Sequence, residues 1–586
     1  MPKPAKTHLH DLKLKLTQGV FYLLFLAIIL RLFYIQIIRH PQYIALAESQ
    51  HWQRREIPAV RGRILSSDHY PLAANLKAYD LYLITKDFST KEKNDSAIDE
   101  LAKIFTSRGI WEIDPDLDTP EKIINEKKEQ LKNSLLDENT HWLLTEKQIP
   151  EETKKVIEEK FNGVFFERHD RRYYPEGNLA AHVLGFVGAN TAGEDQGYFG
   201  VEGYYNGDLA GKPGWISLEK DALGHPIPIG GYVISQAVNG RDLILTLNRE
   251  LQFLLEKKLT EGVEKYGAKS GTFILLEPDS GKILAMGNIP TYRPDHRENT
   301  PNLAIAQNYE PGSVLKTVVM SAGLQEKVVA PSTTFECLGP LTIQSHQIRT
   351  WNNKYHGTES MTEILQHSCN VGAAWLSQQI GLKRYLKYVH AYQLGEKTGI
   401  DLEGEAAGIV KPAQDWQEID LATAAFGQGI SVTPIQLAAI FAAIANDGVK
   451  MKPFVVEKFK LNSQEITVQP KIAKKVLTRE TALALQEMLQ KVVEKGEFKW
   501  FVEQAGLDKF SLAGKTGTAQ IPKEGHYDPH KTNVTFVGFT PVEQPKFVLL
   551  VKLEEPSTST YSADTAVPLW LEMAKELVIY FGISPK

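Results

Sequence analysis

The chain begins with a polar segment, and a long apolar segment follows it. Residues 19–38 read GVFYLLFLAIILRLFYIQII and contain one charged side chain, that of Arg31. About 20 apolar residues are enough for a helix to cross the hydrocarbon core of a bilayer. The residues before this run include one acid, Asp11, and the lysines Lys3, Lys6, Lys13 and Lys15. By the positive-inside rule we predict a cytoplasmic tail over residues 1–18, a transmembrane anchor over 19–39, and an extracytoplasmic location for the rest.

A cleaved signal peptide is the alternative interpretation of this segment. Val20 to Leu30 resembles the apolar core of such a peptide. However, apolar residues continue beyond Arg31, and no Ala-x-Ala site follows soon after. The pattern therefore favours an uncleaved single-pass anchor in the cytoplasmic membrane.

The region after the anchor is rich in charge. Between residues 88 and 160, Lys and Glu accompany Ile and Leu at helical spacing, which predicts solvated amphipathic helices. Between Gly211 and Asn239, many Gly and Pro residues predict loops or a connector near a domain boundary. We therefore predict one domain over residues 40–238 and a second over 239–586.

The second domain alternates between strand-like and helix-like segments. The turn signal EPDSG at residues 277–281 predicts that the two strands beside it form a hairpin. The predicted strands are 243–247, 272–276, 282–286, 535–539 and 547–553, and the predicted helices are 249–266, the run after Ser313, 362 to about 446, and 566–580. Helices gathered around a mainly antiparallel sheet indicate an α+β fold.

Length, charge and cysteine content limit the classes of function that the chain can have. A chain of 586 residues predicts two or three domains, and a net charge of −5 gives no sign of nucleic-acid binding. The two cysteines, Cys337 and Cys369, are too few for a disulfide framework. They could pair in an oxidising compartment, but we expect two unrelated thiols. No group of Cys and His has metal-ligand spacing, so we predict no metal.

Three short motifs carry the candidate chemistry. They are SVLK at residues 313–316, SCN at 368–370 and KTGT at 515–518. In this order they are typical of serine acyltransferases that react with penicillin, which include class A β-lactamases and penicillin-binding proteins. A second Ser-x-x-Lys, at residues 217–220, has no such context.

Ser313 is the candidate nucleophile. Pro311 and Gly312 mark a helix start, so Ser313 falls in the first turn, where free N–H groups stabilise an oxyanion. A spacing of three residues places Lys316 on the same helix face. Lys316 can act as the base only if burial and the nearby charge of Lys515 lower its pKa.

The other motif residues have predicted supporting roles. Ser368 relays a proton to the departing amine, and Asn370 positions Lys316 and the substrate amide. Lys515 attracts the substrate carboxylate. Thr516 and Thr518 assist it through their hydroxyls, and Gly517 leaves room for substrate to lie along the strand as an added one.

Over nearly its whole length the chain resembles a class B penicillin-binding protein, a monofunctional peptidoglycan D,D-transpeptidase. The motifs that carry this resemblance are RGRI at 61–64, Tyr174-Pro175, GVE at 200–202, FGQG at 426–429 and VTPIQLA at 432–438. The resemblance implies a transpeptidase domain of the serine β-lactamase type, preceded by an elongated pedestal domain.

The resemblance also implies a reaction. Ser313 would attack the D-Ala-D-Ala bond of a stem peptide, with the backbone N–H groups of Ser313 and Thr518 as the oxyanion hole. An amine of a second stem peptide would then resolve the acyl-enzyme, whereas a β-lactam would leave a slowly resolving one. No cofactor is implied. Residues 208–214 and 565–568 resemble the FtsI-like division group. The resemblance implies a SEDS-family glycan polymerase as partner. In the division group this partner is FtsW-like, whereas elongation enzymes have a RodA-like partner.

Other functions remain open at this point. A β-lactamase would need a water-directing base, and no Glu-x-x-Leu-Asn string lies between Asn370 and Lys515. A D-Ala-D-Ala carboxypeptidase differs only in its acceptor. A non-catalytic β-lactam sensor would be expected to carry several membrane spans and a cytoplasmic effector, and about 18 residues precede the predicted anchor. An inactive scaffold would have lost a motif residue, and none is lost. A bifunctional enzyme would need a glycosyltransferase motif, and EDQGYF at 194–199 matches that motif poorly.

Overall fold

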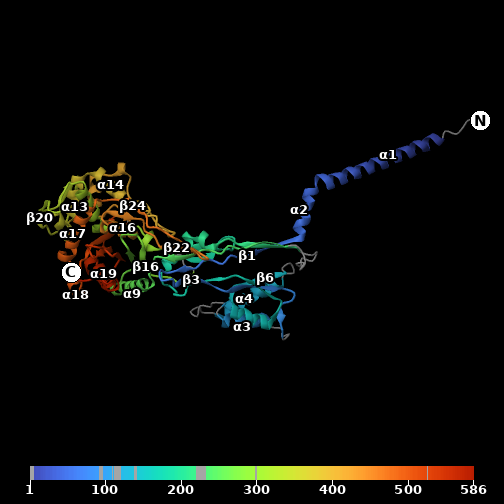
Figure 1. Ribbon diagram of the computed structural model, residues 1–586, viewed down its shortest axis with the longest axis horizontal. Coiled ribbons are helices and arrows are strands. Elements are labelled where there is room, and N and C mark those ends of the chain that lie inside the picture. Colours follow the sequence, from blue (N-terminus) through green and yellow to red (C-terminus); the bar gives the residue numbers. More distant parts are fainter. Residues whose placement is uncertain are drawn as a thin grey trace, which may run out of the picture. The chain divides into compact units, whose positions relative to one another are not determined.

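The structure is a computed structural model, and its ribbon is shown in Figure 1. It describes residues 6–91, 97–108, 110, 120–136, 141–219, 232–296, 300–523 and 526–586. The chain divides into two compact units. One comprises Met1–Ala59 with Gly211–Asn239, and the other comprises Val60–Ala210 with Gly240–Lys586. The predicted boundary at residue 239 stays a prediction.

The first unit contains the predicted anchor. Its elements are α1 (Lys6–Phe33), a π-helical segment (Tyr34–Ile38), α2 (His40–His51), β1 (Trp52–Ile57), β12 (Gly214–Glu219) and β13 (Tyr232–Ser235). The helical stretch Asp11–Ile38 is long and apolar enough to cross a membrane, and its most apolar window is not buried. Lys3, which supported the predicted orientation, lies outside the described residues.

The expectation of loops between Gly211 and Asn239 is wrong for the described part. β12 pairs antiparallel with both β1 and β13 in a three-stranded sheet. The reason is that β-branched and aromatic residues such as Trp215, Ile216 and Val233 occupy the strand positions, and they outweigh the glycines around them. Residues 220–231, which include Lys220 of the second Ser-x-x-Lys, lie outside the described residues.

The second unit begins with the pedestal. Its elements are β2 (Ile64–Leu65), β3 (Pro71–Leu76), β4 (Ala78–Ile84), β5 (Ser89–Thr90), α3 (Ala97–Ser107), α4 (Pro120–Leu135), β6 (Trp142–Pro150), α5 (Glu151–Lys160), β7 (Phe161–Asn162), β8 (Val164–Arg168), β9 (Arg171–Tyr173), α6 (Ala181–Leu184), β10 (Phe186–Ala189), β11 (Asp195–Tyr198), α7 (Gly200–Tyr204) and α8 (Asn206–Ala210).

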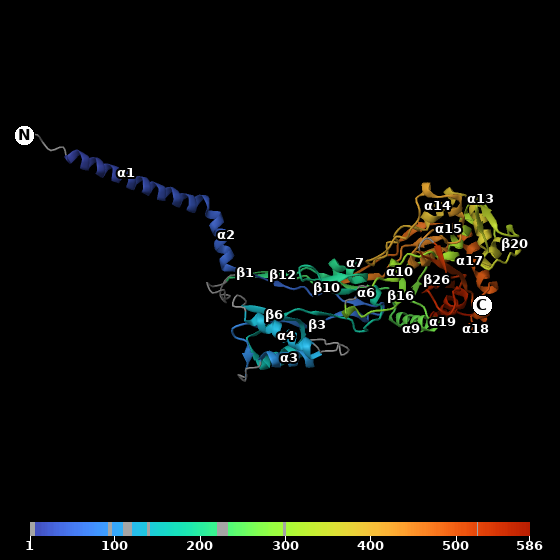
Figure 2. The same cartoon turned by 180° about the vertical axis from the view of Figure 1, so that it is seen from behind.

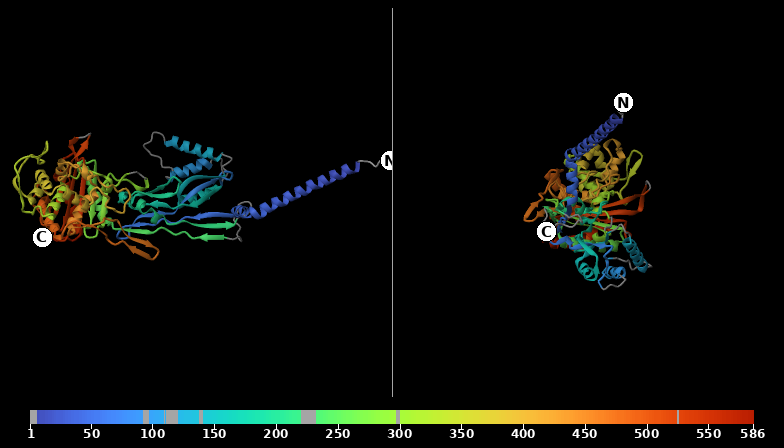
Figure 3. Two further views of the ribbon diagram at one scale, coloured as in Figure 1. Left: turned by 90° about the horizontal axis from the view of Figure 1, so that it is seen from above. Right: turned by 90° about the vertical axis from the view of Figure 1, so that its right-hand side faces the viewer.

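Within the pedestal, α3, α4 and α5 pack on the sheet β6-β4-β8. Figure 3 shows α3 and α4 beside these strands from a second direction. The helices predicted between residues 88 and 160 are therefore confirmed for the described part, although β6 interrupts them. Each helix buries one apolar face, as α3 does with Leu101 and Phe105, and leaves its charges in solvent.

A buried ion cluster connects two of the pedestal motifs, RGRI and GVE, with Arg172, which precedes Tyr174-Pro175. The Glu202 side chain is fully buried, and its two carboxylate oxygens lie 2.6 Å from Arg61 Nη2 and 2.6 Å from Arg172 Nε. Burial raises the pKa of Glu202, but the two guanidinium groups outweigh it and hold this pKa below its usual value. Removing one partner would leave a buried charge unpaired, so the loss of any of the three side chains should destabilise the pedestal.

The elements of the transpeptidase part are β14 (Asp242–Leu245), α9 (Arg249–Tyr266), β15 (Ser270–Leu276), β16 (Ile283–Ile289), η2 (Pro294–His296), α10 (Leu303–Ala306), η3 (Gly312–Leu315), α11 (Lys316–Gln325), β17 (Thr334–Cys337), β18 (Leu341–Ile343), β19 (His346–Ile348), β20 (Gly357–Ser360), α12 (Met361–Gln366), α13 (Asn370–Ile380), α14 (Leu382–Ala391), η4 (Ala413–Asp415), α15 (Glu418–Ala424), α16 (Pro434–Ala445), β21 (Val449–Met451), β22 (Val456–Leu461), β23 (Gln464–Thr467), β24 (Ile472–Lys475), α17 (Arg479–Lys495), α18 (Lys499–Ala505), β25 (Ala513–Lys523), β26 (His526–Thr540), β27 (Phe547–Glu554), η5 (Ser562–Asp564) and α19 (Ala566–Tyr580).

A five-stranded antiparallel sheet of order β16-β15-β27-β26-β25 forms the centre of this part. α9 and α19 pack against each other and against this sheet, and Figure 2 shows them close together. Every residue of β15 is buried, as are all residues of β27 except the last. Side chains on both faces of these strands are therefore covered, and for this reason their sequences read as continuous apolar runs. The α+β prediction is confirmed.

Local signals explain why α9 has the predicted ends. The Asn248 side chain accepts a hydrogen bond from the Leu251 N–H at 3.0 Å and so caps the first turn. Gly267 follows the last turn in the left-handed conformation, with φ +56°, which suits glycine. Both signals are local, so sequence alone could locate this helix.

Candidate active site

Ser313 lies in a tight turn that leads directly into α11. The turn is the 3₁₀ helix Gly312–Leu315, so the predicted helical start holds, with a 3₁₀ first turn in place of an α one. Gly312 has φ +58°, and a Cβ atom there would lie 2.6 Å from the Thr518 carbonyl oxygen. Only glycine allows the serine turn to approach the strand that carries Thr518 this closely.

Lys316 is fully buried and directs its amine at Ser313. Lys316 Nζ lies 3.0 Å from Ser313 Oγ and 2.7 Å from Asn370 Oδ1, and it also donates to the Ser368 carbonyl oxygen. A neutral amine has two N–H groups and one lone pair. The two carbonyl-type oxygens take the N–H groups, which leaves the lone pair for the hydroxyl proton of Ser313.

The electrostatics of the site favour that neutral form. Burial lowers the pKa of Lys316 well below its usual value of 10.5, and the positive charge of Lys515 lowers it further. Burial also lowers the pKa of Lys515, to about 8, while Glu497 acts in the opposite direction. Of the two amines, Lys515 is therefore the better carrier of positive charge, and Lys316 is the one more readily neutral and so available to accept a proton.

Ser368 connects the two lysines. Its Oγ lies 3.1 Å from Lys316 Nζ and 3.0 Å from Lys515 Nζ, so one hydroxyl bridges both amines. The Ser368 backbone has φ +53°, a left-handed conformation that costs a residue with a side chain about 1–3 kcal/mol. The surrounding contacts hold the residue in this conformation, which places its hydroxyl between the Lys316 and Lys515 amines.

The KTGT motif lies on β25, at the edge of the sheet. Thr516 and Thr518 line a cavity of about 550 Å³, together with Ser313, Ser368 and Asn370. The structure therefore brings the predicted residues of all three motifs to one place.

The predicted reason for Gly517 is wrong. A Cβ atom at this position would lie 2.5 Å from the Pro311 carbonyl oxygen and 2.7 Å from Val314 Cγ2. The missing side chain thus makes room for the serine turn and not for substrate, because alternate residues of a strand point to opposite faces. A contact between substrate and the Gly517 backbone stays a prediction.

Two domain families match the chain. The penicillin-binding protein transpeptidase domain matches residues 271–574, and the penicillin-binding protein dimerisation domain matches residues 56–245. The first match alone covers more than half of the chain, and the pair has the order of a pedestal followed by a transpeptidase. The chain belongs to the class B penicillin-binding proteins. It is accordingly a transpeptidase of peptidoglycan synthesis.

Relatives of this class B enzyme align along most of its length. Stage V sporulation protein D of Bacillus subtilis is 29% identical over 96% of this chain and 85% of its own. The probable peptidoglycan D,D-transpeptidase PenA of Neisseria gonorrhoeae is 28% identical over 96% and 91%. Peptidoglycan D,D-transpeptidase FtsI of Escherichia coli is 30% identical over 69% and 66%.

Solved structures of similar fold support the same architecture. Penicillin binding protein 3 of Mycobacterium tuberculosis, in complex with aztreonam, superposes with a TM-score of 0.67 and 24% identity over 91% of this chain and 98% of that one. A peptidoglycan synthetase of Bifidobacterium adolescentis gives a TM-score of 0.72 and 22% identity over 92% and 98%.

Sequence reasoning missed several residues of the class B site. The rings of Trp351 and Tyr561 meet edge to face, with centroids 5.4 Å apart, at the cavity that Ser313 lines. Glu497 also lines it, as do Phe426 and Gln428 of the FGQG segment. That segment was recognised by resemblance but not assigned to the site. The other three lie in loops where the sequence offers no periodic signal.

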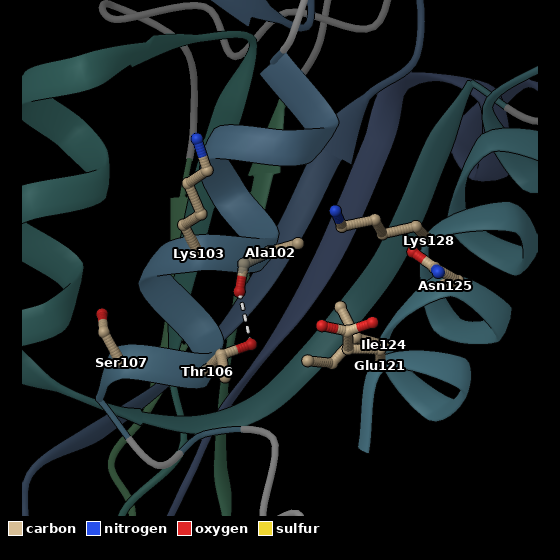
Figure 4. Close-up of a pocket in the computed structure, with 8 residues that line it drawn as sticks. All are labelled: Ala102, Lys103, Thr106, Ser107, Glu121, Ile124, Asn125 and Lys128. Atoms are coloured by element: carbon tan, nitrogen blue, oxygen red, sulfur yellow. Dashed lines mark hydrogen bonds between the residues drawn. The ribbon is translucent and has the colours of Figure 1, made fainter. Parts of the chain in front are cut away.

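A second cavity lies between α3 and α4 of the pedestal, and Figure 4 shows the side chains that line it. Its volume is about 580 Å³. Lys103 and Thr106 approach it from α3, and Glu121 and Lys128 from α4. These side chains include no pair of nucleophile and adjacent base, so the cavity at Ser313 is the candidate active site.

The expectation that Cys337 and Cys369 are unrelated thiols is wrong. Both are buried and free, and their Sγ atoms lie 3.5 Å apart. β17, which ends at Cys337, pairs with β20, and β20 leads through α12 into the SCN motif. This pairing brings together two residues that the sequence separates.

Proposed function

We propose that this class B enzyme cross-links peptidoglycan stem peptides through an acyl-enzyme on Ser313. The observation that carries the proposal is the 3.0 Å contact between Ser313 Oγ and the buried amine of Lys316, whose two N–H groups already have acceptors. An activated serine of this kind needs a base within hydrogen-bond distance, and Lys316 meets that condition.

In the first step, Ser313 Oγ attacks the carbonyl carbon of the penultimate D-Ala of the donor. Lys316 takes the hydroxyl proton as the new ester bond forms. The peptide C–N bond then breaks, and the Ser368 hydroxyl, which contacts both lysine amines, passes a proton to the departing D-Ala amine. The backbone N–H groups of Ser313 and Thr518 stabilise the oxyanion.

Lys515 orients the donor in this scheme. Its amine lies 3.2 Å from Thr516 Oγ1, and Thr516 and Thr518 both line the cavity. A cation flanked by hydroxyl groups suits the terminal carboxylate of a D-Ala-D-Ala peptide, and equally the carboxylate of penicillin.

In the second step, an amine of a neighbouring stem peptide attacks the ester. A new amide bond forms, the ester C–O bond breaks, and Ser313 regains its proton. A β-lactam acylates Ser313 in the same way, but the opened ring stays attached and hinders the acceptor.

The proposal is tested with the full-length enzyme in detergent and synthetic stem pentapeptides as donor and acceptor. Mass spectrometry should detect released D-Ala and a cross-linked product in equal amounts. Release of D-Ala without cross-linking would indicate the carboxypeptidase, and steady hydrolysis of penicillin would indicate the β-lactamase. Acylation by penicillin without release of D-Ala would indicate the sensor, and absence of both would indicate the scaffold.

Acylation by penicillin should have a bell-shaped pH profile. Protonated Lys316 cannot accept the serine proton, so the rate should rise with pH through the lowered pKa of Lys316. Above the pKa of Lys515, about 8, the carboxylate loses its cation and the rate should fall. The second-order acylation rate, measured from about pH 5 to about pH 10, tests this.

Lys515→Arg is the matched variant for the pH profile. Arginine stays charged throughout, so the alkaline fall should disappear while the acidic limb remains. A wild-type rate that increases up to the pKa of an ordinary lysine would contradict the assignment of Lys316 as the base.

We also propose a single-pass topology, with residues 1–18 in the cytoplasm, an anchor over 19–39 and the catalytic domain outside. The apolar stretch Asp11–Ile38 and the lysines before it support this proposal. Protease added to intact spheroplasts should digest the chain from Pro41 onward, while a cytoplasmic marker protein stays intact. Full protection of the catalytic domain would show the opposite orientation.

The proposed cellular role is septal wall synthesis beside a SEDS-family polymerase of the FtsW type. Residues 208–214 and 565–568, which resemble the FtsI-like group, support this role, as does the relative named FtsI. Depletion should give filaments with unfinished septa, and a fluorescent fusion should localise to midcell. Round, swollen cells that still divide would instead indicate the elongation machinery and a RodA-like partner.

A further inference from the structure

Glu497 places a carboxylate in the cavity that Ser313 lines. The residue lies in the short connection between α17 and α18, and it keeps part of its surface in solvent. Among the residues that the structure describes, this carboxylate has no hydrogen-bond partner and no ion-pair partner. The steps assigned to the three motifs do not use it. A carboxylate in this situation can bind a cation that enters the cavity.

The surroundings of Glu497 also make its carboxylate a better proton acceptor. Its pKa is raised overall, because desolvation by the walls of the cavity outweighs the positive charges nearby. These charges belong to Lys515, His367, His356 and Lys316. A carboxylate with a raised pKa takes up a proton more readily than a glutamate in water does.

Glu497 lies beside the SCN motif. α17, which ends two residues before it, packs against α12, and α12 leads into that motif. The neighbouring Gly496 is also close to this segment, because a Cβ atom there would lie 3.7 Å from the Gln366 carbonyl oxygen. In the proposed first step, the Ser368 hydroxyl passes a proton to the departing amine. The acceptor amine later bonds to the carbonyl carbon that the departing amine leaves, so both amines use this side of the site.

Asp564 is another acid that lines the cavity, but its situation differs. Its Oδ2 atom accepts a hydrogen bond from Ser559 Oγ at 2.9 Å. Asp564 belongs to η5, which is joined to the KTGT strand by the Ser562 N–H, 3.1 Å from Thr518 Oγ1. Asp564 therefore lies toward the KTGT strand, and Glu497 is the acid beside the SCN motif.

The second step of the proposed reaction has one proton more than the three motifs can accept. A primary amine is mostly protonated at neutral pH, and an ammonium group has no lone pair with which to attack an ester. When the amide forms, the nitrogen has lost two protons, and Ser313 takes back only one of them. Lys515 cannot take the other while it stays charged to hold the substrate carboxylate. A separate proton acceptor is needed where the acceptor amine enters.

We propose that Glu497 binds the ammonium group of the acceptor stem peptide and takes one of its protons. An N–H bond breaks, an O–H bond forms on the carboxylate, and the proton then leaves to solvent. The neutral amine attacks the ester carbon, the ester C–O bond breaks, and the second proton passes by Ser368 and Lys316 to Ser313 Oγ. This inference rests on the proposed transpeptidation and assigns a residue to its acceptor half.

The experiment uses the full-length enzyme in detergent at neutral pH, below the pKa of Lys515, about 8. The donor is a stem pentapeptide whose amines are all acetylated, so it cannot serve as acceptor. The acceptor is a stem tripeptide with lysine or, in a parallel reaction, meso-diaminopimelate as its third residue. Mass spectrometry then gives the ratio of cross-linked to hydrolysed donor. Both products come from the same acyl-enzyme, so this ratio does not depend on the rate of the first step.

Glu497→Gln should lower this ratio roughly 10²-fold, the lower end of the usual contribution of a positioned proton acceptor. The glutamine has a similar size but neither binds an ammonium group as an anion nor takes its proton. Acylation of Ser313 by a fluorescent penicillin needs no acceptor, so it should stay close to the wild-type rate. That rate also shows that the site of the variant is folded.

Hydroxylamine separates the role of Glu497 from general damage to the second step. This small amine is largely uncharged at neutral pH, so it attacks the ester without first giving up a proton. It should consume the acyl-enzyme equally fast in the wild type and in Glu497→Gln. Glu503→Gln is the matched control, because Glu503 lies on α18, pairs with Lys499 at 3.4 Å and does not line the cavity. This variant should keep the wild-type ratio.

An unchanged ratio in Glu497→Gln would overturn the inference, and so would an equal loss with hydroxylamine and with the stem tripeptide. Slower acylation with an unchanged ratio would overturn it as well, because Glu497 would then act only through the charge of Lys515. Failure of the proposed function gives a different result. A wild-type enzyme that releases D-Ala but cross-links neither acceptor would overturn the transpeptidation itself, and this inference with it.

Discussion

Ser313→Ala is expected to abolish covalent labelling by penicillin. The variant keeps the buried amine of Lys316 but has no oxygen at the position 3.0 Å from it, so no ester can form. Removal of the nucleophile in a serine enzyme lowers turnover on the order of 10⁶-fold, so residual D-Ala release should fall below detection. Mass spectrometry of the intact chain after incubation with penicillin measures the adduct directly.

Ser217→Ala is the matched control for that experiment, because Ser217 is the serine of the other Ser-x-x-Lys string. It lies on β12 in the other compact unit, and this variant should label like the wild type. Peptide mapping should place the wild-type adduct on Ser313. An adduct on Ser217, or full labelling of Ser313→Ala, would contradict the assignment of the nucleophile.

Lys316→Met should slow acylation about 10²- to 10⁴-fold, which is the usual contribution of a positioned base. Methionine fills a similar volume but has no basic lone pair, so Ser313 keeps its place and loses its activation. The second-order rate with a fluorescent penicillin measures the effect, and circular dichroism checks the fold. The nucleophile remains, so slow labelling of Ser313 should persist over long incubations.

Lys450→Met controls for the loss of a buried amine. Lys450 is also fully buried, and burial lowers its pKa to about 7. Its amine donates to the Tyr392 carbonyl oxygen at 2.7 Å and to Gln393 Oε1 at 2.8 Å, and it does not line the catalytic cavity. This variant should acylate at the wild-type rate. A wild-type rate in Lys316→Met would show that another group takes the serine proton.

Local patterns were sufficient for many elements of the fold. The bounds of α9 follow from its capping residues, and the apolar periodicity of residues 566–580 indicates α19; both signals act within a few residues. The pairing of Ser313 with Lys316 also follows from local geometry, since three residues make about one helical turn. Between Gly211 and Asn239 the local signals conflicted. The glycine and proline residues predicted loops, but the β-branched and aromatic residues form strands in the structure.

The sequence by itself determined the three motifs, the order of the domains and the resemblance that names the chemistry, because each depends on residue types at short spacing. The tertiary structure decided what lies between the motifs. Ser368 bridges Lys316 and Lys515, Gly517 faces the serine turn, and Cys337 meets Cys369. These contacts join segments far apart in the chain, and their geometry depends on strand register and on the packing of the sheet edge against the serine turn. Neither the strand register nor this packing can be derived from the spacing of residues along the sequence.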